Sequence, residues 1–158
     1  MLLVDDEPAN LHVLKQTLQN EYHLLFAKDG RVALEIGNQQ KPDLILLDVM
    51  LPELSGYDVC LALKQSPQTS RIPVIFVSSM SDSIDEAHGF EVGAVDYITK
   101  PVSPAIVKAR IATHLSLVRT EELQETRLQI IQRLGRAADT GITKPVCTLY
   151  VSAIIHAY

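Results

Sequence analysis

Short apolar segments alternate with amphipathic segments along most of the chain. The apolar segments have the length of strands and cover residues 1–4, 22–27, 44–47, 72–77 and 94–98. Between them, apolar residues recur at helical spacing, as Leu11, Leu14 and Leu18 do. This spacing predicts helices over residues 8–20, 32–39, 57–65, 82–92 and 104–134. The last helix is long because no glycine or proline follows Pro104 until Gly135.

The third apolar segment is followed directly by an acidic residue. Residues 44–47 leave no polar face, which is typical of a strand covered on both sides by helices. Asp48 comes next, and Pro52 and Gly56 then indicate a loop. Open α/β sheets place their ligand sites at the carboxyl ends of such strands. Asp48 is therefore a candidate functional residue, although an acid in this place can also simply end the strand and contact water.

Strands and helices that alternate in this way form parallel sheets through right-handed crossovers. We therefore predict an α/β fold: a flavodoxin-like, doubly wound sheet of five parallel strands in the order 2-1-3-4-5, with an extended C-terminal helix. In that order the first and third strands are neighbours, so Asp5 and Asp6 lie beside Asp48. Ser78 and Lys100, at the ends of the fourth and fifth strands, belong to the same edge of the sheet.

The polar residues at this edge have complementary chemistry. Three carboxylates repel one another unless a cation joins them, and their hard oxygen atoms favour Mg²⁺. Lys100 adds a positive charge suited to a phosphate group, and Ser78 adds a hydroxyl donor. Together these groups can support phosphoryl transfer onto an aspartate. Taken singly, each has an ordinary explanation: Asp6 as a complement to a helix dipole, Ser78 as a turn residue and Lys100 as a surface lysine.

Composition and charge narrow the range of functions. The 158 residues are 47% hydrophobic and 21% charged, which is ordinary for one globular domain with an appendage. The net charge of −5, without a run of Lys or Arg, predicts no nucleic-acid binding. We expect no membrane association, because no apolar run has the length of a span and no signal peptide is recognisable. Two cysteines without metal-ligand spacing, Cys60 and Cys147, favour a reducing, cytoplasmic location.

The candidate residues lie within segments that resemble a known family. These are the pair Asp5-Asp6, the segment DVMLPELSG that begins at Asp48, and the segment GAVDYITKP that contains Tyr97 and Lys100. In order and spacing they resemble the receiver domains of bacterial two-component response regulators. The resemblance extends over residues 1–116.

The resemblance implies a signalling function rather than an enzyme. Asp48 would accept a phosphoryl group from a histidine kinase in a Mg²⁺-dependent reaction, and the domain would then change conformation and signal to a downstream protein or output domain. Mg²⁺ would bind to Asp5, Asp6, Asp48 and the backbone carbonyl of Met50. Lys100 and Ser78 would contact the phosphoryl group, and Ser78 and Tyr97 would form a switch pair.

The chain continues beyond the part that resembles a receiver. We predict a receiver domain over residues 1–116, a helical linker over residues 117–135 and a short tail over residues 136–158. In the linker, Leu123, Ile130 and Leu134 fit part of a heptad seam, which leaves open either a solvated helix or a dimer helix. A homodimer through the fourth and fifth helices, or through this extension, is one expectation for a partner.

Residues 122–138 resemble the beginning of the output domain in response regulators that carry an HD-GYP cyclic-di-GMP phosphodiesterase. The sequence then departs from that family, because no His-Asp dipeptide and no Gly-Tyr-Pro follows. We therefore interpret the tail as a truncated remnant of such a domain and expect no phosphodiesterase activity. Its apolar residues 146–155 could pack on another chain.

Two further functions remain as alternatives. One is an enzyme fragment from a cyclic-di-GMP phosphodiesterase response regulator, which the missing motifs disfavour. The other is a flavodoxin-like module that binds a nucleotide or flavin. The loop after the first strand disfavours that module, because it lacks glycine and is acidic where a phosphate cradle needs N–H groups and positive charge.

Overall fold

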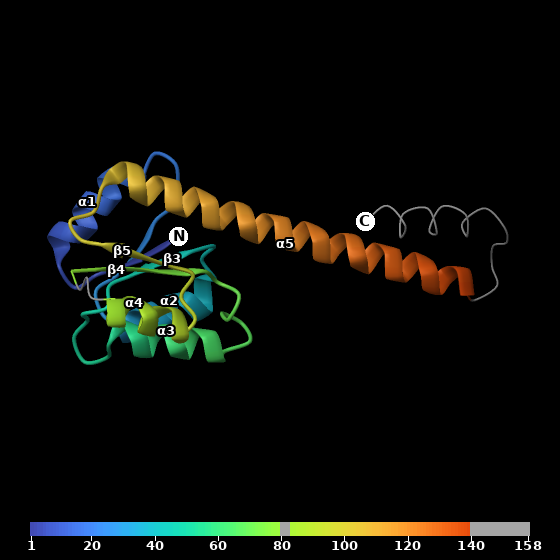
Figure 1. The fold of residues 1–158 in the computed structure, drawn as a ribbon, viewed down its shortest axis with the longest axis horizontal. Coiled ribbons are helices and arrows are strands. Elements are labelled where there is room, and N and C mark those ends of the chain that lie inside the picture. The colour runs from blue at the N-terminus through green and yellow to red at the C-terminus, as the bar shows by residue number, and fades with distance from the viewer. Residues whose placement is uncertain (80–82, 140–158) are drawn as a thin grey trace. The chain divides into compact units, whose positions relative to one another are not determined.

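The computed structural model describes residues 1–79 and 83–139. Within them, strands and helices alternate as the sequence predicts (Figure 1). The strands are β1 (Leu2–Val4), β2 (Leu25–Ala27), β3 (Ile45–Leu47), β4 (Val74–Ser78) and β5 (Asp96–Thr99). The helices are α1 (Pro8–Leu18), α2 (Gly30–Gln40), α3 (Gly56–Gln65), α4 (Ser83–Glu91) and α5 (Pro104–Asp139).

The five strands form one parallel sheet in the order β2-β1-β3-β4-β5. This order confirms the predicted doubly wound α/β fold. β1 and β3 are direct neighbours, with Val4 opposite Leu47 in the register. Figure 1 shows α2, α3 and α4 on one face of the sheet, and α1 and the first turns of α5 on the other. Both faces are therefore covered, which is why β1 and β3 consist only of apolar residues and β4 is apolar up to Ser78 at its carboxyl end.

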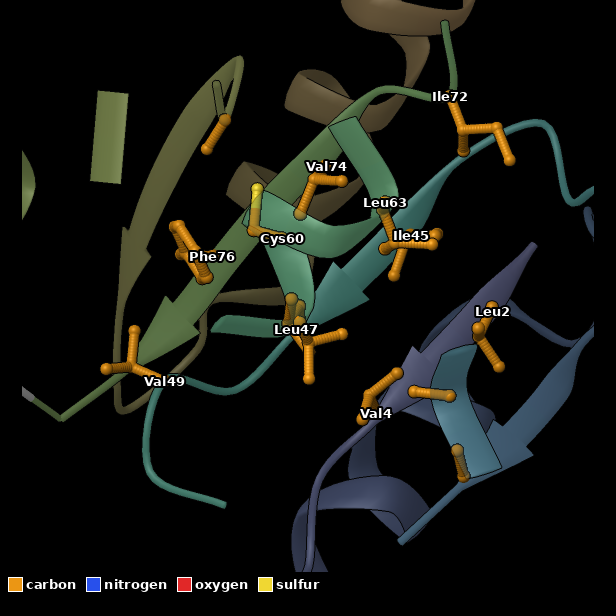
Figure 2. Packing of buried hydrophobic residues seen from close by; sticks show 14 of the residues in the cluster. Leu2, Val4, Ile45, Leu47, Val49, Cys60, Leu63, Ile72, Val74 and Phe76 are labelled. Carbon is orange, nitrogen blue, oxygen red and sulfur yellow. The ribbon is translucent and has the colours of Figure 1, made fainter. Parts of the chain in front are cut away.

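Alternate residues of β1, β3, β4 and β5 belong to two hydrophobic clusters, one on each face. Figure 2 shows the cluster on the α2–α3 face, where Ile45 and Leu47 of β3 lie near Cys60 and Leu63 of α3. The residues between them, such as Leu46, belong to the second cluster on the α1–α5 face. The three leucines predicted to form the apolar face of α1 are all buried in that second cluster: Leu11, Leu14 and Leu18. Burial of apolar surface on both faces is the main force that holds the sheet between its helices.

Several boundaries differ from those that the sequence predicts. β2 begins at Leu25 rather than at residue 22, because the backbone N–H of Tyr22 still donates to Leu18 at 3.0 Å and ends α1. α5 does not stop at Gly135 but continues to Asp139. A single glycine weakens a helix by only about 1 kcal/mol and does not end it by itself. On α5, Ile106 is 49% exposed, whereas Val107 and Ile111 are buried in the cluster that covers this face of the sheet.

The chain divides into two compact units, Met1–Ser116 and Leu117–Tyr158. The first contains the whole sheet and both hydrophobic clusters. In the second, the described part is the continuation of α5, on which Leu117, Leu123, Leu128 and Ile130 are exposed. The predicted tail lies largely outside the described residues, as do residues 146–155. Within residues 1–79 and 83–139, no helix combines the length and hydropathy needed to cross a bilayer.

Candidate functional site

The acidic residues selected from the sequence lie at the carboxyl ends of two adjacent strands. Asp5 follows β1, and its backbone N–H donates to Ala27 at 3.2 Å. Asp48 follows β3, and its backbone N–H donates to Val4 at 2.9 Å. These bonds extend the ladder of the sheet by one residue and so fix both acids at its edge. Asp5 is 1% exposed and Asp48 5% exposed, whereas Asp6 is exposed.

Lys100, from the loop after β5, joins the two buried carboxylates. Its Nζ atom donates to Oδ2 of Asp48 at 2.6 Å and to Oδ2 of Asp5 at 2.8 Å. Partial burial alone would lower the pKa of this ammonium group, but the hydrogen bonds and negative charges of Asp48 and Asp5 outweigh it and raise the pKa above 10.5. Lys100 is therefore held in its charged form, in ion pairs that join the carboxyl ends of β1, β3 and β5.

The three carboxylates are close enough to share one cation. Asp5, Asp6 and Asp48 each offer an oxygen atom, and these atoms lie within 4.8 Å of one another. Carboxylate oxygens are the hard donors that Mg²⁺ prefers, and Mg²⁺ commonly takes one or two carboxylates and keeps several waters. One lysine cannot neutralise three acids, so the cluster retains negative charge. The donor set and its charge therefore fit Mg²⁺.

The loop after β3 and the start of α3 fix the position of Asp48. The backbone N–H of Met50 donates to Oδ1 of Asp48 at 3.1 Å, so the carboxylate accepts a bond on each oxygen. Gly56, the first residue of α3, packs directly on this backbone: a Cβ atom there would lie 2.1 Å from the Asp48 carbonyl oxygen. Its N–H donates to Val49 at 2.8 Å. The glycine in the sequence motif thus allows α3 to begin against the candidate aspartate.

Sequence reasoning missed one residue of this site. Asn10, in the first turn of α1, donates from Nδ2 to Oδ1 of Asp5 at 3.0 Å. A signal was available, because Pro8 indicates the first turn of a helix and Asn10 lies in that turn, five residues after Asp5. Asn10 also lines a cavity of about 160 Å³ beside Asp5 and Lys100, whose other walls are Val13, Leu14, Val77, Pro101 and Val102.

Ser78 and Tyr97 lie near this edge but differ in their surroundings. Ser78 ends β4 and is fully buried, and its carbonyl oxygen accepts the backbone N–H of Lys100 at 2.8 Å. Tyr97 lies in β5 and is 6% exposed, with its ring centroid 6.2 Å from that of Phe76. A Cβ atom on Gly89 of α4 would lie 3.5 Å from the tyrosine ring. Tyr97 is thus packed between β4 and α4.

The first unit resembles known proteins in sequence and in fold. It matches the family model of the response regulator receiver domain over residues 1–112. A protein of Vibrio cholerae named "Probable cyclic di-GMP phosphodiesterase" is 46% identical over 123 residues, which are 78% of this chain and 28% of that protein. Response regulator PleD of Caulobacter vibrioides is 38% identical over 138 residues, 83% of this chain and 30% of that protein. The chain thus spans less than a third of either relative.

A solved structure agrees in the same region. The receiver domain of a sensor histidine kinase from Pseudomonas aeruginosa has a magnesium ion coordinated in its active-site cleft. It superposes with a TM-score of 0.68 at 28% identity, over 73% of this chain and 95% of that one. The acidic pocket formed by Asp5, Asp6 and Asp48 lies at the edge where the sequence places it. The chain therefore belongs to the response regulator receiver domains, the phosphoacceptor modules of two-component signalling.

Proposed function

We propose that Asp48 is the residue that accepts the phosphoryl group. Its Oδ atom would attack the phosphorus of a phosphohistidine on a histidine kinase, so that a P–O bond forms while the P–N bond breaks and the imidazole leaves with the electron pair. The observation that carries the proposal is the contact of Lys100 with both Asp48 and Asp5, at 2.6 and 2.8 Å. The ammonium group already lies where the negative charge of a phosphoryl group would develop.

Asp5, Asp6, Asp48 and the backbone carbonyl of Met50 are the proposed ligands of Mg²⁺. When bound, the ion would supply positive charge that offsets repulsion between the carboxylates and the incoming phosphate. The distance of at most 4.8 Å among the carboxylate oxygens supports the acidic part of this set. Lys100 and Ser78 are the proposed contacts of the phosphoryl group, Lys100 because of its position and Ser78 because it ends the next strand at the same edge.

The proposed output is a change at Ser78 and Tyr97. A phosphate on Asp48 adds negative charge and acceptor oxygens that attract the hydroxyl of Ser78. Tyr97 is buried between Phe76 and α4, so the proposed switch is an exchange between this buried ring position and an exposed one. A coupling free energy of about 1–3 kcal/mol between phosphorylation and the ring position would change the populations of the two positions about 5- to 150-fold. The exchange would alter the surface formed by α4, β5 and α5.

Several partners follow from this proposal. A histidine kinase would be the phosphodonor, and a downstream protein or output domain would recognise the changed surface.

We also propose a receiver over residues 1–116, a linker over residues 117–135 and a tail over residues 136–158. A homodimer through α4 and α5, or through the extension of α5, remains a prediction, and the exposed Leu123 and Ile130 support the second form. A cytoplasmic location also remains a prediction that rests on the cysteine usage.

The segment of residues 122–138 suggests the kind of output domain. We propose that it represents the beginning of an HD-GYP output domain, in agreement with the likeness to the Vibrio cholerae phosphodiesterase. For this chain we propose no hydrolase activity. The test is incubation with cyclic di-GMP and Mn²⁺ or Mg²⁺, in which hydrolysis above that of a metal-free control would contradict this view.

The phosphoacceptor proposal is tested by intact mass spectrometry after incubation with acetyl phosphate and Mg²⁺. The parent protein should gain one phosphoryl mass that hydroxylamine removes, because an acyl phosphate is attacked by this nucleophile. Asp48→Asn should gain none. Asp43→Asn is a matched control, since Asp43 is an exposed acid that precedes the same strand. Transfer from a phosphorylated histidine kinase is the second donor. Failure with both donors, or phosphorylation of the Asp48→Asn variant, would refute the assignment.

A further inference from the structure

The carboxylate of Asp5 accepts hydrogen bonds from two further donors besides the ammonium group of Lys100. Its Oδ1 atom accepts from the backbone N–H of Glu7 at 2.9 Å and from Nδ2 of Asn10 at 3.0 Å. Its Oδ2 atom accepts from Lys100 at 2.8 Å. The two oxygens therefore have separate tasks: Oδ1 is fixed to the start of α1, and Oδ2 faces the other charged groups of the site.

Asn10 is itself fixed in place. Its backbone N–H donates to the Glu7 carbonyl at 3.1 Å, and its Nδ2 atom also donates to Oε2 of Glu7 at 3.2 Å. The amide nitrogen thus gives its two hydrogens to two acids and has little freedom to rotate. Glu7, the N-cap of α1, makes no capping bond with its own side chain. The Asn10 amide therefore links the first turn of α1 to Asp5.

We propose that Asn10 is a positioning residue that orients Asp5 for Mg²⁺. The inference rests on the proposed function, because it concerns how one of the proposed ligands is held. Lys100 contacts Oδ2 of Asp5 in this structure, and it is also the proposed partner of the phosphoryl group. When Lys100 turns to phosphate, Asp5 loses that bond. The bonds from Asn10 and Glu7 to Oδ1 persist, so the carboxylate keeps its orientation toward the cation through the reaction.

A purely structural role predicts a different behaviour. If Asn10 only stabilises the first turn of α1, its removal lowers the stability of the fold by the same amount with and without Mg²⁺. If Asn10 orients Asp5, its removal weakens Mg²⁺ binding itself. Hydrogen bonds to charged groups are strong enough that losing this one should weaken Mg²⁺ binding about tenfold. Mg²⁺ affinity therefore separates the two roles.

The experiment compares the parent protein with Asn10→Ala and Asn10→Leu by isothermal titration with MgCl₂. Leucine branches at Cγ as asparagine does but has no donor, so it separates the hydrogen bond from the contacts that a branched side chain makes. Asn38→Ala is the matched control, because Asn38 is exposed on α2 and its Nδ2 atom donates to the Leu34 carbonyl at 2.9 Å. Both Asn10 variants should bind Mg²⁺ about tenfold more weakly, and the control should bind as the parent does.

Kinetics with acetyl phosphate provide a second readout. The Mg²⁺ concentration for half-maximal phosphorylation should rise about tenfold in both Asn10 variants, whereas the rate at saturating Mg²⁺ should change far less. Unchanged Mg²⁺ affinity in both variants, or weakened affinity in the alanine variant alone, would overturn the positioning role. Failure of the parent protein to bind Mg²⁺ or to accept phosphate would instead refute the proposed function, so the two failures are distinguishable.

Discussion

Two partly buried lysines lie at opposite edges of the sheet and are held by different partners. Lys100, at the carboxyl edge, donates to the carboxylates of Asp48 and Asp5. Lys64, on α3, donates to the backbone carbonyls of Ile72 at 2.7 Å and Ser70 at 3.1 Å, just before β4 begins. Burial lowers the pKa of Lys64, whereas at Lys100 the same effect of burial is outweighed by the bonds and charges of Asp48 and Asp5, which raise the pKa.

The difference shows how charge distinguishes a functional edge from a structural one. The carbonyls around Lys64 are neutral, and the lysine ties α3 to the segment before β4. The acids around Lys100 carry more negative charge than one lysine can neutralise, so the binding of a second cation there is electrostatically favourable. An excess of acids over bases therefore distinguishes the functional site from the structural contact. Replacing each lysine in turn tests this distinction.

Lys100→Met should give the largest effect. It leaves Asp5 and Asp48 buried beside each other without a cation, and breaking a buried pair costs about 3–5 kcal/mol. In EDTA the free energy of unfolding, measured by urea denaturation, should fall by about 3 kcal/mol. Mg²⁺ should restore part of this loss because it neutralises the same acids.

Lys108→Met is the matched control for this prediction. Lys108 pairs with Glu21 at 2.5 Å, but both side chains are more than 40% exposed, at 41% and 47%. Exposed pairs contribute about 0–1 kcal/mol, so this variant should lose less than about 1 kcal/mol. The prediction would be wrong if Lys100→Met lowered the free energy of unfolding as little as Lys108→Met does, or if Mg²⁺ did not change the loss. Either result would show that repulsion among the carboxylates does not destabilise the fold.

Lys64→Met should have a smaller effect that does not depend on Mg²⁺. The variant leaves the carbonyls of Ile72 and Ser70 without this donor, and an unsatisfied buried polar group costs about 1–3 kcal/mol. Because Ser70 is only partly buried, we expect a loss near the lower end, about 1–2 kcal/mol. The measurement is the same urea denaturation in EDTA and in Mg²⁺. A loss that Mg²⁺ reverses would contradict the assignment of Lys64 to a structural role.

Strand burial explains how much of the site could be predicted from the sequence. The run of apolar residues 44–47 shows that β3 is covered on both faces, and its end locates Asp48 at the sheet edge. The alternation of short strands and helices is typical of a flavodoxin-like sheet, and the strand order of that fold brings Asp5 and Asp48 together. These inferences depend on backbone direction alone, which periodicity encodes well.

Residues that act through side-chain contacts were harder to find. Asn10 bonds to Asp5 only because the loop after β1 turns tightly into α1, and that geometry is not encoded in a pattern of apolar residues. The same holds for Asp96, whose carboxylate accepts from Arg110 and lies 3.0 Å from His114 of α5. Pairs separated by 14 and 18 residues leave no periodic signal. The exposure of Ile106 has a similar cause, because the rotation of α5 on the sheet decides which apolar residue is covered.

The two lysines should also respond to pH with opposite signs. Lys64 has a pKa below 10.5 in the folded state and regains the higher value on unfolding. Between these values the unfolded state binds more protons, so the contribution of Lys64 to stability rises with pH. Lys100 has a raised pKa in the folded state, so its contribution is complete below pH 10.5 and is lost only as the pH rises through the folded value.

The measurement is the difference in unfolding free energy between each methionine variant and its parent, from pH 8 to above 10.5. Cys60 lies beside Lys64 and titrates in the same range, because burial raises its pKa from 9.0 to about 11. The comparison should therefore be made in a Cys60→Ala background. The difference for Lys64→Met should grow with pH up to 10.5, while that for Lys100→Met should stay constant below 10.5 and shrink above it. If both differences in unfolding free energy changed with pH in the same direction, the charge of the neighbouring groups would not distinguish the two lysines. Only the carboxylates around Lys100 can reverse the effect of burial on the pKa.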